Sequence, residues 1–411
     1  MAIVNPFKAV RPSRDKVALV SSKSYEAYTH AELGAKLDFN PYSFLHIVNP
    51  DYKFLQEVST ERRFLSVHNR YEDFKRNQIF IKDKIPAFYI YERIDAQHSF
   101  CGIIGATSIA DYLNGDIKKH EGTISKRERL FQKYLKIIGF NAEPILLTFK
   151  DDETIAEIIT QEKKKRPEYE FSTTDKKLHK LWLVTDENIT QKIRKAFAKI
   201  KTLYIADGHH RTASSALLAK DLASENENHT GNEAYNFFMS YLIPESQLDI
   251  AEFNRFVKDL NGLSLTEFLG KLSVSFTITN HGQQVYFPDK KHHFSMYVHG
   301  EFYSLYLKED VYKFTDSLSA LDAEILYRTV LNPILGIEDL SNNDRTGHSD
   351  TKKDIVSIKT KVDLGLYTVG FSLTPVTVHE MKEIADANLK MPPKTTYIQP
   401  KLRSGLTIYE F

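Results

Sequence analysis

The first half of the chain alternates between short apolar runs and amphipathic stretches. The apolar runs 87–94, 100–109 and 144–149 predict buried strands, whereas the charged stretch 59–77 predicts a helix. Strands that alternate with helices in this way are typical of mixed α/β proteins.

A further helix is predicted to begin at residue 125. Ser125 and Glu128 have the Ser-x-x-Glu spacing of a capping box. Behind them, apolar residues recur on one helical face, at Leu130, Tyr134, Ile137 and Ile138. The sequence therefore predicts an amphipathic helix with a capped first turn.

The clearest pattern lies between residues 181 and 223. Thr185 or Asp186 can cap a helix whose apolar face runs from Ile189 to Ile200. The predicted order is strand, helix, strand, turn and helix, at 181–185, 186–200, 202–206, 207–211 and 212–223. This order describes an α/β unit.

The polar stretch 224–233 has little to bury and is the candidate domain boundary. Beyond it, alternating apolar and polar residues predict antiparallel strands, with a hairpin turn at 299–301, and a helix follows from Thr377. We therefore expect an α/β lobe over 1–230 and an α+β lobe, rich in antiparallel strands, over 231–411.

Composition and charge narrow the classes of function. The 55 Lys and Arg residues almost cancel the 54 Asp and Glu residues, so the net charge of +1 gives no general attraction to nucleic acid or to an anionic membrane. The single cysteine, Cys101, excludes an internal disulfide and a thiolate metal cluster, and its apolar surroundings predict burial.

The same properties indicate where the protein acts and on what. No signal-like apolar region and no apolar stretch of the roughly 20 residues needed to cross a bilayer is present, so we expect a cytoplasmic protein. The expected partner is a small-molecule substrate rather than nucleic acid or membrane, with self-association into a homo-oligomer left open.

The candidate chemistry centres on the turn Asp207-Gly208-His209-His210-Arg211. A strand ends just before it and a helix begins just after it, so the free N–H groups of the first helical turn can bind an anion. Gly208 permits the left-handed backbone of a tight turn, and Arg211 offers a fork suited to phosphate. The two histidines add hydrogen-bond donors or a proton shuttle.

The carboxylate of Asp207 would repel a phosphate bound at this turn. A carboxylate ~4 Å from a phosphate oxygen would cost about 4 kcal/mol at an effective dielectric of about 20. Asp207 would therefore hold a divalent cation such as Mg²⁺, accept a proton as a general base, or turn away and pair with Arg211. The third alternative is the structural one, an i,i+4 ion pair in an ordinary helix.

Two other segments offer candidate residues. Glu121 lies on a loop before the helix at 125 and could serve as a base or a magnesium ligand if the fold brings it to Asp207. In the tail 391–401, the groups suited to anion contact are Lys394, Thr395, Thr396 and Lys401, although the tail could equally be a rigid closing strand. A zinc site is disfavoured because the His-Glu-x-x-His pattern and cysteine ligands are absent.

Four blocks of the chain resemble a family of bacterial proteins known as domain of unknown function 1015. They lie, in the order that the family shows, at 118–131, 204–217, 321–337 and 391–406, and the segment 7–12 looks similar as well. The resemblance therefore extends over nearly the whole chain. It implies kinship, because the family has no established activity.

The turn at 207–211 also resembles the phosphate-binding motif of the ParB/sulfiredoxin-like superfamily, which includes free-serine kinases. The resemblance implies a ParB/sulfiredoxin-like core in the N-terminal half and contacts to nucleotide phosphates from Asp207, Gly208, His209, His210 and Arg211. A counterpart of the sulfiredoxin cysteine is missing at this turn.

The resulting hypothesis is a phosphotransfer enzyme that uses ADP or ATP with Mg²⁺ and acts on a small hydroxyl compound such as serine. Asp207 or Glu121 would take the hydroxyl proton and His210 would assist, while Lys394 and Thr395 would contact phosphate. A phosphatase, a non-catalytic nucleotide or phosphometabolite sensor and a nucleic-acid hydrolase are the alternatives.

Overall fold

The computed structural model describes residues 2–50, 52, 58–251, 254–340, 343–349 and 355–411. The chain divides into two units. The first comprises Met1–Lys119, Thr123–Leu248 and Pro400–Phe411, and the second comprises His120–Gly122 and Asp249–Gln399. The C-terminal segment therefore folds with the N-terminal half of the chain.

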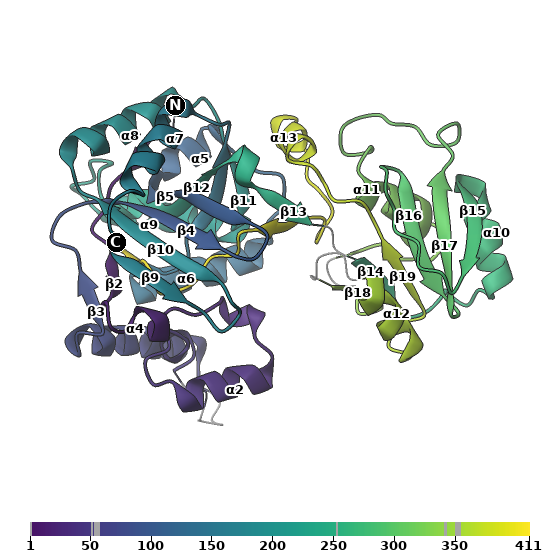
Figure 1. Cartoon of the computed structure of the whole chain (residues 1–411), viewed down its shortest axis with the longest axis horizontal. Helices are drawn as coiled ribbons and strands as arrows, with labels where there is room; N and C mark the ends of the chain where they lie inside the picture. The colour runs from purple at the N-terminus through teal and green to yellow at the C-terminus, as the bar shows by residue number, and fades with distance from the viewer. Residues whose placement is uncertain (1, 51, 53–57, 252–253, 341–342, 350–354) are drawn as a thin grey trace. The chain divides into compact units, whose positions relative to one another are not determined.

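A nine-stranded sheet forms the centre of the first unit (Figure 1). Its strands are β1 (Val4–Asn5), β4 (Phe88–Ile94), β5 (Ser99–Ser108), β6 (Ile117–Lys118), β8 (Ile145–Phe149), β9 (Tyr169–Ser172), β10 (Leu178–Val184), β11 (Leu203–Asp207) and β12 (Phe237–Pro244). They follow the order β6-β11-β8-β12-β5-β4-β10-β9, and β1 pairs with β5. The pairs β6–β11 and β8–β12 are parallel, and the others are antiparallel.

Helices pack on this sheet and on one another. The helices of the first unit are α1 (Val17–Val20), α2 (His30–Phe39), α3 (Leu45–Val48), α4 (Thr60–Arg76), α5 (Ile109–Leu113), α6 (Ser125–Ile138), α7 (Glu153–Glu162), α8 (Glu187–Lys199) and α9 (His209–Glu225). Apolar residues of α7 and α8 pack on the sheet in one buried cluster, and those of α4 and α6 form a second cluster with Leu218 of α9. The predicted mixed α/β class is confirmed.

None of the helices in the described part of the chain combines the length and the apolar character needed to span a bilayer.

Two predicted helix caps have different outcomes. Asp186 caps α8, because its carboxylate accepts a hydrogen bond from the Ile189 N–H at 3.1 Å. The capping box predicted at Ser125 and Glu128 is wrong: Ser125 is already helical, and Ile124 occupies the cap position without a side-chain hydrogen bond. A capping residue must lie outside the helix, so a start one residue earlier than expected removes the box.

The division between the units falls after Leu248, whereas the sequence pattern places it at 230/231. Strand β12 lies beyond the polar stretch 224–233 and yet pairs with both β5 and β8 in the middle of the first unit's sheet. Its residues are buried on both faces from Phe238 to Pro244, which suits a central strand. The polar stretch is thus a connection within the first unit.

The second unit is built on a six-stranded antiparallel sheet in the order β15-β17-β16-β19-β14-β18. Its strands are β14 (Asn254–Val257), β15 (Phe276–Gly282), β16 (His293–Val298), β17 (Glu301–Leu307), β18 (Thr346–Ser349) and β19 (Val369–Ser372), and β13 (Asp249–Ala251) pairs separately with β20 (Tyr397–Gln399). The predicted hairpin joins β16 to β17 through His299 and Gly300, both with positive φ.

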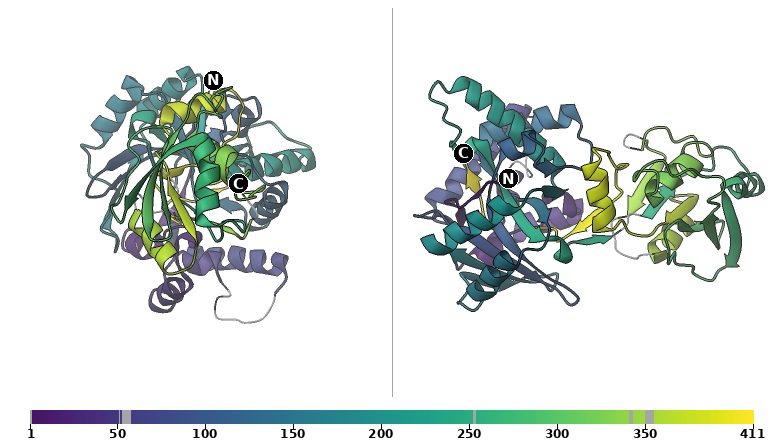
Figure 2. Two further views of the ribbon diagram at one scale, coloured as in Figure 1. Left: turned by 90° about the vertical axis from the view of Figure 1, so that its right-hand side faces the viewer. Right: turned by 90° about the horizontal axis from the view of Figure 1, so that it is seen from above.

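Neighbouring residues of these strands point to opposite sides of the sheet, and helices cover both (Figures 1 and 2). Val257 belongs to the cluster that contains residues of α10 (Leu265–Ser275) and α11 (Asp322–Leu326), and Phe256 packs with α12 (Ile355–Asp363). A π-helical turn, Tyr327–Leu331, follows α11. Helix α13 (Val378–Asp386) begins with a Thr377–Glu380 capping box, at the predicted position.

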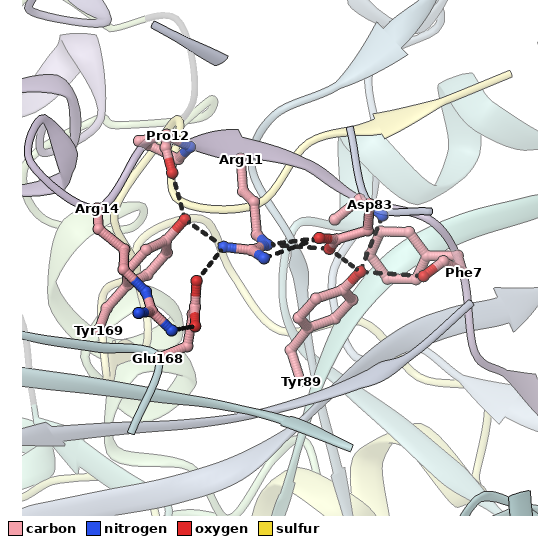
Figure 3. A network of polar contacts seen from close by, with 9 residues as sticks. Phe7, Arg11, Pro12, Arg14, Asp83, Tyr89, Glu168 and Tyr169 are labelled. Atoms are coloured by element: carbon pink, nitrogen blue, oxygen red, sulfur yellow. Dashed lines mark hydrogen bonds and ion pairs between the residues drawn. The ribbon is translucent and has the colours of Figure 1, made fainter. Parts of the chain in front are cut away.

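Figure 3 shows a network of polar contacts that fixes the N-terminal segment in the first unit. The Arg11 guanidinium pairs with Asp83 at 2.8 Å and with Glu168 at 2.8 Å, and it donates to the Tyr169 hydroxyl at 2.7 Å. Arg14 binds the other oxygen of Glu168. Arg11 comes from β2 (Val10–Pro12), which pairs with β3 (Phe80–Lys82), so the network ties this pair to β9.

The C-terminal segment crosses the first unit and ends in β21 (Tyr409–Glu410), which pairs with β7 (Phe140–Asn141). The Glu410 carboxylate accepts a hydrogen bond from the Tyr71 hydroxyl at 2.8 Å and pairs with Lys75 and Lys82, both at 2.7 Å. Ile408, fully buried, hydrogen-bonds with Val10 through both backbones. This segment is therefore an internal part of the first unit.

The buried histidine of β10 should make the fold acid-sensitive. His179 stacks on Phe171 at 5.1 Å between ring centroids, and burial lowers its pKa to about 3 from an ordinary value of 6.5. Between these pH values the unfolded chain binds a proton that the folded chain does not. The free energy of unfolding should then fall by up to about 1.4 kcal/mol per pH unit as the pH is lowered from 6.5.

Urea unfolding of wild type and His179→Phe between pH 8 and pH 4 tests this expectation. The variant should lose less stability per pH unit below pH 6.5, and above pH 7.5 the two curves should run parallel because the histidine is neutral in both states. Identical slopes below pH 6.5 would contradict it.

Candidate functional site

The turn between β11 and α9 has the predicted conformation. Asp207 ends the strand, His209 begins the helix, and Gly208 between them adopts the left-handed region with φ 102°. A Cβ atom at Gly208 would lie 3.3 Å from Ile145 Cγ1 and 3.4 Å from Arg211 Nη2. Both the backbone conformation and the available space therefore favour glycine.

Asp207 lies between two cations. Lys401 Nζ is 2.9 Å from Oδ1, and Arg211 Nη2 is 3.0 Å from Oδ2. Burial by itself raises the pKa of Asp207, but the charges of Lys401 and Arg211 outweigh it, and the pKa lies below its ordinary value. The pairing with Arg211 is the structural alternative anticipated from the sequence, and Lys401 adds a second partner.

Arg211 is held by the protein on several sides. Nη1 donates to the backbone carbonyls of Glu143 and Pro144, both at 3.1 Å, and lies 3.5 Å from the Glu143 carboxylate. The Ser404 hydroxyl donates to that carboxylate at 2.5 Å. The Lys401 side chain is 44% exposed and that of Arg211 21%. Lys401 is thus the more accessible cation, and Arg211 fixes the position of Asp207.

The two histidines differ in environment. His209 is buried, and burial lowers its pKa to about 3 despite the opposing charge of Asp207. His209 is therefore neutral at physiological pH and cannot add a positive charge there. His210 is partly exposed, and its backbone carbonyl accepts a hydrogen bond from the Ser214 hydroxyl at 2.7 Å.

The N-terminus of α9 differs from those of α7 and α8. Those helices have an aspartate cap and a glutamate in the first turn, whereas α9 has glycine at the cap position and no acidic residue in its first turn. Gly208 has no side-chain oxygen to accept the first N–H groups. A helix of 17 residues with such a start presents a partial positive charge at that end.

The other predicted site residues belong to the second unit. Glu121 is part of the segment His120–Gly122, and Lys394 is exposed with a positive φ of 57°. Thr395 is buried, and its hydroxyl donates to the Pro392 carbonyl at 2.6 Å. A role for these residues beside Asp207 stays a prediction, whereas Arg211 and Lys401 meet Asp207 within the first unit.

Substitution of Gly208 should destabilise the first unit more than substitution of another left-handed glycine. Gly208→Ala combines an unfavourable φ with the contacts to Ile145 and Arg211, and we expect a loss of about 1–3 kcal/mol. Gly139, which ends α6 with φ 78°, has open space around its Cβ position, so Gly139→Ala should cost only the penalty of the left-handed backbone, about 1 kcal/mol.

Chemical denaturation of the two variants measures this difference. If both variants lost the same free energy of unfolding, the atoms around Gly208 would accommodate the added methyl group at no cost, and the expectation would be wrong.

Comparison with solved structures gives only distant similarities. SbnI with a C-terminal truncation, from Staphylococcus aureus, matches with a TM-score of 0.40 and 11% sequence identity, covering 74% of this chain and 87% of the other. A free serine kinase mutant in complex with AMP matches with a TM-score of 0.36 and 11% identity, covering 71% and 88%. A conserved hypothetical protein from Pyrococcus furiosus matches with a TM-score of 0.31 and 14% identity, covering 71% and 92%. Similarity at this level assigns no activity to the chain.

Sequence comparisons are more specific about kinship. No curated protein gave a significant match. A family model described as "Protein of unknown function (DUF1015)" matches residues 4–324, which confirms the family resemblance seen in the sequence blocks. The chain therefore belongs to the DUF1015 family.

Proposed function

We propose that the turn at 207–211 binds phosphate and that the protein transfers a phosphoryl group between a nucleotide and a small hydroxyl metabolite. One observation carries the proposal: an ionised carboxylate, 37% exposed, stands between two cations at the glycine-capped start of a long helix. This arrangement combines an acceptor for a proton with groups that favour a phosphate.

The phosphate-binding part consists of the first turn of α9 and Lys401. The N–H groups of a helix N-terminus and an ammonium group both favour anions, and phosphoryl transfer depends mainly on positioning and neutralisation of charge. Lys401 would move from Asp207 to the phosphate oxygens. Arg211, which also binds the carbonyls of Glu143 and Pro144, would keep Asp207 in place.

The proton-transfer part is Asp207. In the kinase direction, the hydroxyl oxygen of the acceptor forms a bond to the terminal phosphorus of the nucleotide, and the bond from that phosphorus to the leaving phosphate oxygen breaks. The hydroxyl proton passes to Asp207. His210 would assist this transfer.

In the alternative anticipated from the sequence, Asp207 would hold Mg²⁺ instead of accepting the proton, since carboxylate oxygens are the preferred ligands of Mg²⁺ in proteins. Both oxygens of Asp207 already form ion pairs, at 2.9 and 3.0 Å, so the metal would replace Lys401 on Oδ1. When bound, it would neutralise charge on the transferred phosphoryl group.

Turnover is tested by incubating the full chain with ADP or ATP, Mg²⁺ and a panel of amino acids and sugars that includes serine, followed by ³¹P NMR. Asp207→Asn should lower the rate about 10²–10⁴-fold through loss of the base. Lys401→Met should lower it about 10²-fold through loss of charge stabilisation. Lys136→Met is a matched control, because Lys136 is 42% exposed and pairs with Glu225 on another surface.

The outcomes separate the alternatives. Activity that survives both Asp207→Asn and Lys401→Met would overturn the assignment of the turn. If nucleotide raises the melting temperature of the wild type and no phosphate is transferred to any acceptor, the protein is a sensor and the enzymatic proposal fails. Release of inorganic phosphate from a phosphorylated metabolite would identify the phosphatase direction.

The pH dependence of turnover should report on Asp207. Its carboxylate is the active form, so kcat/KM should fall only as the pH drops into or below the range of an ordinary aspartate, about 3.9. Burial raises the pKa of Asp207 and the charge of Lys401 lowers it. Lys401→Met removes that charge, so the fall of kcat/KM at low pH should move to higher pH. The matched comparison is Lys136→Met. If kcat/KM of Lys401→Met fell at the same pH as in that control, or at a lower pH, the result would argue against Asp207 as the base.

A further inference from the structure

The second unit contains a buried arginine in the middle of its sheet. Arg255 lies on β14, where its backbone pairs with Phe371 of β19 and His348 of β18. Residues alternate in direction along a strand, so Arg255 shares a face with Val257 and not with Phe256. Its exposed fraction is 9%.

The charge of Arg255 has little compensation among the residues that the structure describes. Nη2 donates to the Pro393 carbonyl at 2.7 Å, and no carboxylate among the described residues pairs with the guanidinium. Burial lowers the pKa of Arg255 to about 10, so the group is still charged at neutral pH. A buried charge without a counterion is unfavourable, and an arginine has five N–H donors to satisfy.

Two other arginines that are largely removed from water, Arg93 and Arg11, are matched by acids. Arg93, which is also buried, lies 3.2 Å from Asp95. Arg11 lies between Asp83 and Glu168, each at 2.8 Å. Arg255 therefore differs from both of these arginines, which have carboxylate partners.

The loop that Arg255 contacts carries a second cation. Lys394 directly follows Pro393, is exposed, and adopts a left-handed conformation with φ 57°. The loop is anchored on both sides: the Met391 N–H before it donates to the His120 carbonyl at 2.8 Å, and β20 after it pairs with β13. The loop is thus held beside Arg255 by contacts that do not use its charge.

We propose that Arg255 binds an oxyanion, the carboxylate or phosphate group of a small ligand, beside the Pro392–Thr396 loop. A guanidinium presents two parallel N–H groups that match the oxygens of such a group, and a single carbonyl leaves most of its donors available. Lys394 adds charge at the same loop. All residues of this site belong to the second unit.

The competing explanation is that Arg255 only anchors the Pro393 carbonyl. Lysine can make that single contact but lacks the planar fork, so Arg255→Lys separates the two roles. If Arg255 only anchors the carbonyl, Arg255→Lys should bind anions as the wild type does. If Arg255 binds the anion, Arg255→Lys should lose that binding.

Binding is measured on the full chain by isothermal titration with inorganic phosphate and, separately, with malonate, at constant ionic strength set with NaCl. At least one of the two anions should bind the wild type. Arg255→Lys and Arg255→Met should weaken that binding by at least about tenfold, which corresponds to 1.4 kcal/mol. Arg345→Met is the matched control: Arg345 lies in the same unit but is paired with Asp259 at 2.5 Å, and its removal should leave binding unchanged.

Hydrogen exchange of the wild-type chain gives a test that needs no variant. Phosphate or malonate should protect backbone amides in 254–257 and 391–399. Protection confined to 204–212 would overturn the Arg255 site and leave the proposed function intact. Absence of binding by both anions, or equal weakening in Arg255→Met and Arg345→Met, would also overturn it.

Discussion

The ion pairs of Asp207 join parts of the chain that are far apart in sequence, and the arrangement of the candidate site depends on them. Arg211 is one helical turn away, but Lys401 comes from the segment that returns to the first unit after the whole of the second. The same segment places Ser404 on Glu143 and, further along, Glu410 on two lysines and a tyrosine. The site therefore depends on the packing of the C-terminal segment as much as on the strand and helix that form its turn.

Local features were the most predictable from the sequence. The turn at Gly208 follows from a strand, a glycine and a helix in direct succession, and the cap at Asp186 follows from a side chain next to the helix that it begins. Hydrophobic periodicity depends on neighbouring residues, so it also located the strands β4, β5, β8, β10 and β11.

Features set by distant contacts were not predictable in this way. No local pattern reveals that Lys401 meets Asp207, since that contact results from the path of the C-terminal segment. The position of β12 between β5 and β8 is likewise set by the topology of the sheet. The polar residues before β12 suggested a domain boundary there, whereas the boundary lies after Leu248. The start of α6 shifted by one residue, enough to remove the cap expected from Ser125.

The discontinuous first unit has a consequence for how the protein is made. A ribosome synthesises the chain in order, so the residues of the second unit are complete before Pro400–Phe411 exists. Until then, β7 lacks its partner strand, Val10 lacks the backbone of Ile408, and Asp207 lacks one of its two counterions. The first unit can thus reach its final form only after the second unit has been translated, although most of its residues emerge first.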